Sequence, residues 1–232
     1  MFAGASELAR LIDHTLLRAT ATPADIELLC GEAVQYGFYS VCVNPCHVTR
    51  AAAFLKDTEV KVCSVIDFPL GAGTLGIKAL EGMEAVRNGA HELDVVMNIG
   101  LFKARMYEDV ALELFDFIRL SPDAVHKVII ETCYLTDAEK AGAAKLVSEL
   151  GAEFVKTSTG FGPSGATVED IILIKENIDR NTKIKASGGI RDLATLVSMV
   201  QAGAERIGTS CGSMIMDEFE RGHKSNGDQF GR

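Results

Sequence analysis

Short apolar stretches rich in β-branched residues recur along the chain and alternate with stretches of helical periodicity. Some of them, such as Val95-Val96 and Val128-Ile129-Ile130, lack the polar alternation of a half-exposed strand. That pattern is typical of strands covered on both faces. Eight such stretches begin near Leu11, Tyr39, Val60, His91, His126, Glu153, Lys183 and Arg206.

The segments between these stretches carry the start and stop signals of helices. Thr22 followed by Pro23 is typical of a helix start, and Thr136 with Glu139 forms a capping-box pattern. The dipeptides Gly89-Ala90, Gly151-Ala152 and Gly203-Ala204 each precede a predicted strand, as expected for a helix end followed by a tight turn. The chain is therefore predicted to consist of repeated βα units.

Eight βα units predict an α/β protein with a (β/α)₈ TIM barrel. The alternative is an open, doubly wound parallel sheet. No linker interrupts the pattern, so residues 1–220 are predicted to form one barrel domain. Residues 221–232 are polar and lack periodicity, which predicts a flexible tail.

The composition and net charge of the chain indicate which kinds of molecule it binds. The chain has 232 residues, of which 47% are hydrophobic and 24% charged, an ordinary globular balance. Its formal net charge is −9, which argues against nucleic acid as a partner. A small anionic substrate requires a locally positive pocket on such a protein.

The chain shows no sign of membrane insertion or secretion. No apolar run approaches the ~18 residues of a membrane span, and the N-terminus lacks a signal-peptide pattern. The six cysteines are scattered through apolar stretches rather than arranged as a disulfide framework. These features predict a reduced, cytoplasmic protein.

Four charged residues lie within stretches that should be buried: Asp13, Asp94, Lys156 and Lys185. Lysine is rarely buried without a partner, so a plain internal ion pair is one interpretation. The other is an amine nucleophile. A second ammonium group about 5 Å away at an effective dielectric constant of ~20 disfavours protonation by roughly 2 pKa units, so a lysine pair favours the free amine. A nearby carboxylate can then move protons through water.

Glycine-rich segments follow the last two predicted strands. They are Ser187-Gly188-Gly189 and the run from Gly208 to Gly212. In barrels, the loops after strands seven and eight often bind phosphate on backbone N–H groups. Their joint position predicts a phosphate site, although each glycine alone is explained equally well by a turn.

Two other motifs match known binding sites only in part. Gly71 to Gly76 matches the dinucleotide fingerprint G-x-G-x-x-G, but Asp67 to Leu70 separates it from the preceding strand. Cys42, Cys46 and His47 form a cluster without a second pair to complete four ligands. No metal and no cofactor is therefore predicted.

Several segments resemble, in the right order, the signatures of the deoxyribose-phosphate aldolase family. The resemblance runs from about Ser6 to Phe219, and its most specific part is Lys156-Thr157-Ser158-Thr159-Gly160 with a downstream Lys-x-x-Gly-Gly. The other matching segments are Leu11 to Leu17, Phe68-Pro69-Leu70-Gly71, Glu92 to Val96 and Ile184 to Arg191.

The resemblance implies a class I aldolase on a (β/α)₈ barrel that takes part in deoxyribonucleotide catabolism and carbohydrate degradation. Its reaction would be the reversible cleavage of 2-deoxy-D-ribose 5-phosphate to D-glyceraldehyde 3-phosphate and acetaldehyde. Lys156 would form the Schiff base, Lys185 would favour its free amine, and Asp94 would act as the acid/base group. The implied substrate-binding residues are Asp13, Cys42, Gly160, Gly188, Gly189, Gly208 and Ser210.

The sequence departs from the family at two places. Members often carry two serines after strand eight, but here the second position is Cys211, which puts one hydroxyl contact in doubt. Some members end in a tyrosine, whereas this chain has Phe230. The resemblance suggests a homodimer, although no interface is recognisable in the sequence. Another class I aldolase, a non-catalytic phosphosugar-binding barrel and a nicotinamide-binding protein remain alternatives.

Overall fold

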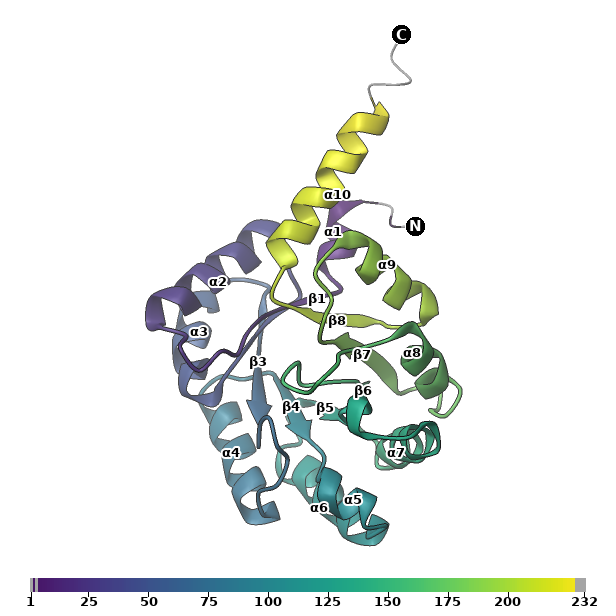
Figure 1. Ribbon diagram of the computed structural model, residues 1–232. Helices are drawn as coiled ribbons and strands as arrows, with labels where there is room; N and C mark the ends of the chain where they lie inside the picture. The colour runs from purple at the N-terminus through teal and green to yellow at the C-terminus, as the bar shows by residue number, and fades with distance from the viewer. Residues whose placement is uncertain (1, 3, 228–232) are drawn as a thin grey trace.

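Eight parallel strands close into a barrel in the computed structural model, which describes residue 2 and residues 4–227, without the side chains of 223–227 (Figure 1). Each strand pairs with the next along the chain, and the last pairs with the first. This closure confirms the barrel and excludes the open sheet. The strands are β1 Ile12–Leu16, β2 Ser40–Val43, β3 Lys61–Ile66, β4 Glu92–Val96, β5 Val125–Ile129, β6 Phe154–Lys156, β7 Lys183–Ser187 and β8 Arg206–Thr209.

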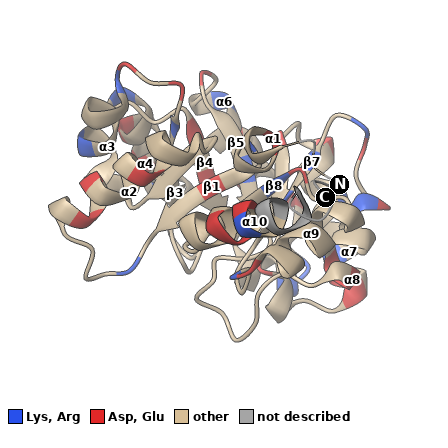
Figure 2. Ribbon diagram, turned by 90° about the horizontal axis from the view of Figure 1, so that it is seen from above, with Lys and Arg blue, Asp and Glu red and all other residues tan. Residues whose placement is uncertain are grey.

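The helices surround the barrel, and their charged residues are spread over the outside of the molecule (Figures 1 and 2). The longer ones are α2 Pro23–Tyr36, α3 Val48–Leu55, α4 Leu75–Arg87, α6 Tyr107–Leu120, α7 Asp137–Glu149, α8 Val168–Lys175, α9 Leu193–Ala202 and α10 Gly212–Gly227. The shorter ones are α1 Ala5–Ala9, α5 Ile99–Lys103 and the 3₁₀ turns η1 Pro45–His47 and η2 Thr132–Tyr134.

The predicted caps fix where the helices begin. The Thr22 hydroxyl accepts from the Asp25 N–H, and the Asp25 carboxylate accepts from the Thr22 N–H in return. Thr136 and Glu139 make the same reciprocal pair at the start of α7. Each such cap stabilises its helix by about 1 kcal/mol. The two caps therefore define the first residues of α2 and α7.

The C-terminal boundary differs from the expectation. Helix α10 runs to Gly227 and leads away from the barrel (Figure 1), so the first residues of the segment 221–232 are helical rather than a tail. Extending an existing helix costs far less than nucleating one, which allows a polar segment without periodicity to continue α10. The rest of the predicted tail, including Phe230, lies outside the described residues. Within the described part, no helix is long and apolar enough to span a membrane.

The apolar core lies between the strands and the surrounding helices, and includes Ile12, Val41, Leu93, Val128 and Val155. The inside of the barrel is different, because its centre is filled by charged side chains instead of the branched apolar residues usual in this fold. The strand order and register bring these charged side chains together. The seven are Asp13, Glu92, Asp94, Lys127, Lys156, Lys185 and Arg206, all at most 5% exposed.

Candidate active site

Asp94, on β4, lies at the centre of the charged interior. Its Oδ2 atom accepts hydrogen bonds from Lys156 and Lys185, each at 2.7 Å, and its Oδ1 atom accepts one from Lys127 at 2.7 Å. Asp94 is fully buried, so these three ammonium groups replace the water that a carboxylate would otherwise bind. One carboxylate therefore organises three buried amines.

Lys156 and Lys185 are directly opposite each other on β6 and β7. Because both Nζ atoms lie 2.7 Å from the same oxygen, they are no more than twice that distance, 5.4 Å, apart. The structure thus brings together the two lysines and the aspartate singled out in the sequence. Asp13 joins them through an ion pair with Lys185 at 2.5 Å.

The interior charges form a closed circuit. Lys127 bridges Asp94 and Glu92, at 2.7 Å from each. Arg206 bridges Glu92 and Asp13, at 3.0 and 2.7 Å. Together with the Lys185 contacts this gives an alternating circuit of three carboxylates and three cations, here named the charge ring: Asp94, Lys127, Glu92, Arg206, Asp13 and Lys185.

The ring holds its members in their charged forms. Burial raises the pKa of Asp94, but the three ammonium groups outweigh it and keep that pKa well below its usual value. Burial lowers the pKa of Lys185, but the charges of Asp13 and Asp94 outweigh it, so the pKa is raised. Burial also lowers the pKa of Lys127, but nearby negative charges, above all that of Asp94, outweigh it and raise this pKa well above its usual value. Asp94 is therefore ionised, and Lys185 is a cation, at neutral pH.

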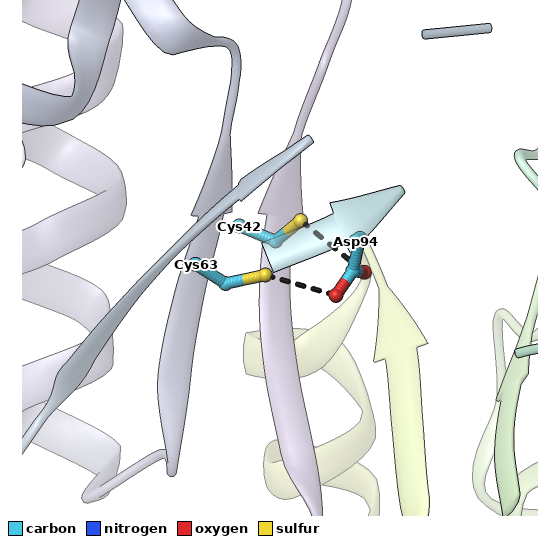
Figure 3. A group of neighbouring side chains, drawn as sticks. All are labelled: Cys42, Cys63 and Asp94. Atoms are coloured by element: carbon cyan, nitrogen blue, oxygen red, sulfur yellow. Dashed lines mark hydrogen bonds between the residues drawn. The ribbon is translucent and has the colours of Figure 1, made fainter. Parts of the chain in front are cut away.

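Cys42 and Cys63 point toward Asp94 from β2 and β3 (Figure 3). The Cys63 thiol donates to Oδ1 at 3.1 Å, and Cys42 Sγ lies 3.9 Å from Oδ2. Three such ligand atoms within 4.8 Å of one another have the spacing of a metal site. Both Asp94 oxygens already accept from ammonium groups, however, and Lys127 Nζ lies 3.3 Å from Cys63 Sγ. This concentration of positive charge disfavours a metal cation.

A cavity of about 570 Å³ opens above the charged interior and reaches Lys156. It is lined by all five residues predicted for phosphate binding: Gly160, Gly188, Gly189, Gly208 and Ser210. Its lining includes the basic residues Arg18, Lys156 and Arg191 and, in the described part of the chain, no acidic residue. The acidic protein thus has a locally positive cavity, as a small anionic substrate requires.

Two glycines of this cavity are required by the backbone or by packing. Gly188 has a φ of +83°, and a Cβ there would lie 2.9 Å from the Cα of Gly165. At Gly208, on the inner side of β8, a Cβ would lie 3.1 Å from Cε of Lys185. Gly208 therefore makes room for Lys185 as well as lining the cavity.

The loop that matches the dinucleotide fingerprint has a different role. The N–H groups of Gly71 and Gly73 donate to Asp67, and the buried Lys78 donates to the carbonyl of Gly71. Helix α4 begins only at Leu75, so the glycines do not form a turn directly between a strand and a helix. Their backbone groups are committed within the loop, and the geometry does not match a pyrophosphate cradle.

Sequence reasoning missed Lys127, Glu92 and Arg206. Glu92 could have been found by its spacing, because it is two residues before Asp94 and so faces the same side of β4. Lys127 and Arg206 needed the strand register, which pairs them with Asp94 and Lys185. Arg18 and Arg191 were not predicted either, since loop positions carry no periodicity that points toward a cavity.

Comparison with known proteins agrees with this geometry. The model of a family described as DeoC/LacD family aldolase matches residues 8–217. The chain is 53% identical over 221 residues to the deoxyribose-phosphate aldolase of Carboxydothermus hydrogenoformans, covering 94% of this chain and 97% of that protein. Among solved structures, an aldolase named QR15 superposes with a TM-score of 0.89 at 47% identity, with 93% and 96% of the two chains covered. A tetrameric deoxyribose phosphate aldolase from Aeropyrum pernix gives 0.89 at 34% identity, covering 94% and 93%.

Proposed function

The chain belongs to the DeoC/LacD family of aldolases and is a lyase, and from this premise we propose its substrate and its nucleophile. The proposed reaction is the reversible cleavage of 2-deoxy-D-ribose 5-phosphate to D-glyceraldehyde 3-phosphate and acetaldehyde, through a Schiff base on Lys156. One observation carries the choice of nucleophile. Of the three lysines that contact Asp94, Lys156 is the one that lines the cavity, within the described part of the chain.

Imine formation comes first. The free amine of Lys156 attacks the C1 aldehyde of the open-chain sugar, and the resulting carbinolamine loses water to give a protonated imine. The ammonium of Lys185 lies within 5.4 Å of the Lys156 nitrogen, by the distances to Asp94 Oδ2. This like charge favours the free amine and therefore promotes the attack.

Bond cleavage then uses the imine as an electron sink. The C3 hydroxyl loses its proton, the C2–C3 bond breaks, and its electron pair moves toward the iminium nitrogen. D-Glyceraldehyde 3-phosphate leaves, and an enamine of acetaldehyde stays on Lys156. Protonation of the enamine carbon and hydrolysis of the imine then release acetaldehyde and regenerate the amine.

Asp94 is suited to the proton transfers because its basicity changes during the reaction. Positive charge on Lys127, Lys156 and Lys185 holds the pKa of Asp94 low and makes Asp94 a poor base, and the protonated imine keeps that charge on the nitrogen of Lys156. When the enamine forms, the nitrogen of Lys156 loses its positive charge, one of those three charges disappears, and the basicity of Asp94 rises. We infer that Asp94 accepts the proton of the C3 hydroxyl, through water, as the C2–C3 bond breaks and returns it to the enamine carbon.

The substrate phosphate would bind at the far side of the cavity. Gly188 and Gly189, both with positive φ, follow β7, and Ser210 follows β8. Arg18 and Arg191 add positive charge at the same cavity. The phosphate does not react, so these contacts supply binding energy and orient C1 toward Lys156. Cys211 occupies the position of a second serine, and its backbone N–H donates to Thr209 Oγ1 at 2.9 Å.

Covalent trapping tests the proposal directly. We expect the protein to cleave 2-deoxy-D-ribose 5-phosphate, as measured by a coupled assay for D-glyceraldehyde 3-phosphate. We also expect borohydride with acetaldehyde to reduce the imine and label Lys156, as measured by peptide mapping. Labelling confined to other lysines would contradict the assignment of the nucleophile. Binding of the sugar without any imine would favour a non-catalytic barrel.

Activity is expected to survive exhaustive chelation. The residues that have metal-site spacing, Cys42, Cys63 and Asp94, lie against ammonium groups that oppose a cation. The cleavage rate after prolonged EDTA treatment and buffer exchange should equal that of the untreated protein. Loss of activity that a divalent ion restores would place the enzyme in the metal-dependent class of aldolases.

We also propose a cellular compartment and an oligomeric state. All six cysteines are free, which suits the reduced cytoplasm. A homodimer stays a prediction, and light scattering on the purified chain measures it.

A further inference from the structure

Two buried charged residues take no part in the proposed chemistry. Glu92 and Arg206 lie at the starts of β4 and β8, and neither belongs to the cavity lining. Glu92 is 1% exposed and Arg206 is 5% exposed. The Arg206 guanidinium also lies over the ring of Tyr39, 3.5 Å from its centroid. Burying two charges this deep is costly, so their presence calls for a function or a compensating network.

The network is the charge ring. Glu92 contacts Lys127, which contacts Asp94, and Asp94 contacts Lys156. Arg206 contacts Asp13, which contacts Lys185, and Lys185 contacts the same oxygen of Asp94. Glu92 therefore lies two contacts from Asp94 along the ring, and Arg206 lies three contacts away by this path. They reach it through opposite sides.

The formal charges of the ring balance, with three carboxylates against three cations. Lys156 is a fourth cation, outside the ring, that contacts Asp94. A buried charge without compensation is costly, and burial favours the neutral form of the group that carries it. The ionisation of Lys156 consequently depends on whether the ring stays balanced.

We propose that Glu92 and Arg206 are positioning residues that set, through the charge ring, the pH range in which Lys156 is a free amine. This inference rests on the proposed function, because it takes Lys156 as the nucleophile. The two residues act by their charge, through Lys127 and Asp13, without touching the substrate.

The proposal requires effects of opposite sign. Removing the negative charge of Glu92 disfavours the Lys156 ammonium, so the free amine persists to lower pH. Removing the positive charge of Arg206 favours the ammonium, so the free amine appears only at higher pH. A unit charge about 10 Å away, at an effective dielectric constant of about 20, shifts a protonation midpoint by roughly one pH unit.

The other groups that face the site are the same in every variant, so they cannot produce midpoint shifts of opposite sign. Lys127 and Lys185 have raised pKa values and Asp94 has a lowered one, so all three keep their charge around neutral pH. The titratable and charged groups around Lys156 and the ring are Asp13 on β1, Tyr39 and Cys42 at β2, Cys63 on β3, Asp94 on β4, Lys127 on β5, Lys185 on β7, Arg18 and Arg191 in the cavity lining, and Glu92 and Arg206 themselves.

The experiment measures the initial rate of borohydride trapping with acetaldehyde against pH. It compares the unmodified chain with Glu92→Gln, Arg206→Met and the double variant. We expect the midpoint of the pH profile to move down by about one unit for Glu92→Gln and up by about one unit for Arg206→Met. The double variant restores a balanced ring, so its midpoint should return to within a few tenths of a unit of the original.

Two conservative variants serve as controls. Glu92→Asp and Arg206→Lys keep the charge and change the contacts, so they should leave the midpoint in place. Shifts of the same sign in both charge-removing variants, or no shift in either, would overturn the inference. If Arg206→Met does not fold, as judged by circular dichroism, the comparison of Glu92→Gln with Glu92→Asp decides the matter alone. Failure of the unmodified chain to be labelled at Lys156 would instead refute the proposed function.

Discussion

Replacing Lys156 with methionine is expected to lower the cleavage rate by about 10⁴-fold or more while leaving the fold as stable as before. The loss of rate follows from removing the nucleophile on which the imine forms. The stability should hold because Lys156 is the additional cation on a ring whose other charges balance. Methionine has a similar length, and without Lys156 the ring still holds equal numbers of carboxylates and cations.

Steady-state kinetics and thermal unfolding of the same preparation measure the two effects. Asp94→Asn is the matched control, since it removes the carboxylate that three buried ammonium groups share. It should lose activity and also about 3–5 kcal/mol of stability, the usual result of leaving buried charges unpaired. Comparable destabilisation by Lys156→Met would show that Lys156 is an integral part of the ion network.

Replacing Lys185 with methionine is expected to slow imine formation at pH 7 by roughly 100-fold. One like charge within about 5 Å of the Lys156 nitrogen disappears, and at an effective dielectric constant of about 20 this favours the ammonium by roughly two pH units. The defect should shrink as the pH rises toward 10. Because the pKa of Lys185 is raised, the unmodified enzyme keeps this charge over the whole range.

Trapping rate and turnover, each measured against pH, separate two roles of Lys185. An electrostatic role predicts that both fall together at pH 7 and recover together in alkali. A role in carrying the proton predicts normal trapping with low turnover at every pH. Unchanged trapping at pH 7 in the methionine variant would eliminate the electrostatic role.

The barrel could be predicted from the sequence because the signals for its strands and helices are local. Each predicted strand begins within one residue of the observed one, as for Val60 against Lys61 and Glu153 against Phe154. Periodicity, glycine stops and capping boxes repeat in every unit, so an error in one unit does not change the fold.

The site was predicted only in part because the sequence does not show which residues at the strand starts face the inside of the barrel. Asp94, Lys156 and Lys185 stand out as charges near the ends of apolar runs. Glu92 and Arg206 begin their strands, and Lys127 follows His126 near the start of β5. Side chains alternate between the two faces of a strand, so the position of a residue along its strand decides whether it points into the barrel. The residues that it contacts there depend on the register, which is fixed only by pairing between strands.

The charge ring ties the active site to the chain's ends. Asp13 and Arg206, joined at 2.7 Å, are separated by 193 positions in the sequence. Any fragment that lacks either end, such as a half-barrel, would leave Lys185 or Glu92 short of a partner in a buried place. Folding therefore completes the charge ring only when the last strand joins the first, a contact that is among the slowest to form. Lys156 and Lys185 lie on neighbouring strands, so barrel closure supplies the charges that surround the two lysines rather than the lysine pair itself.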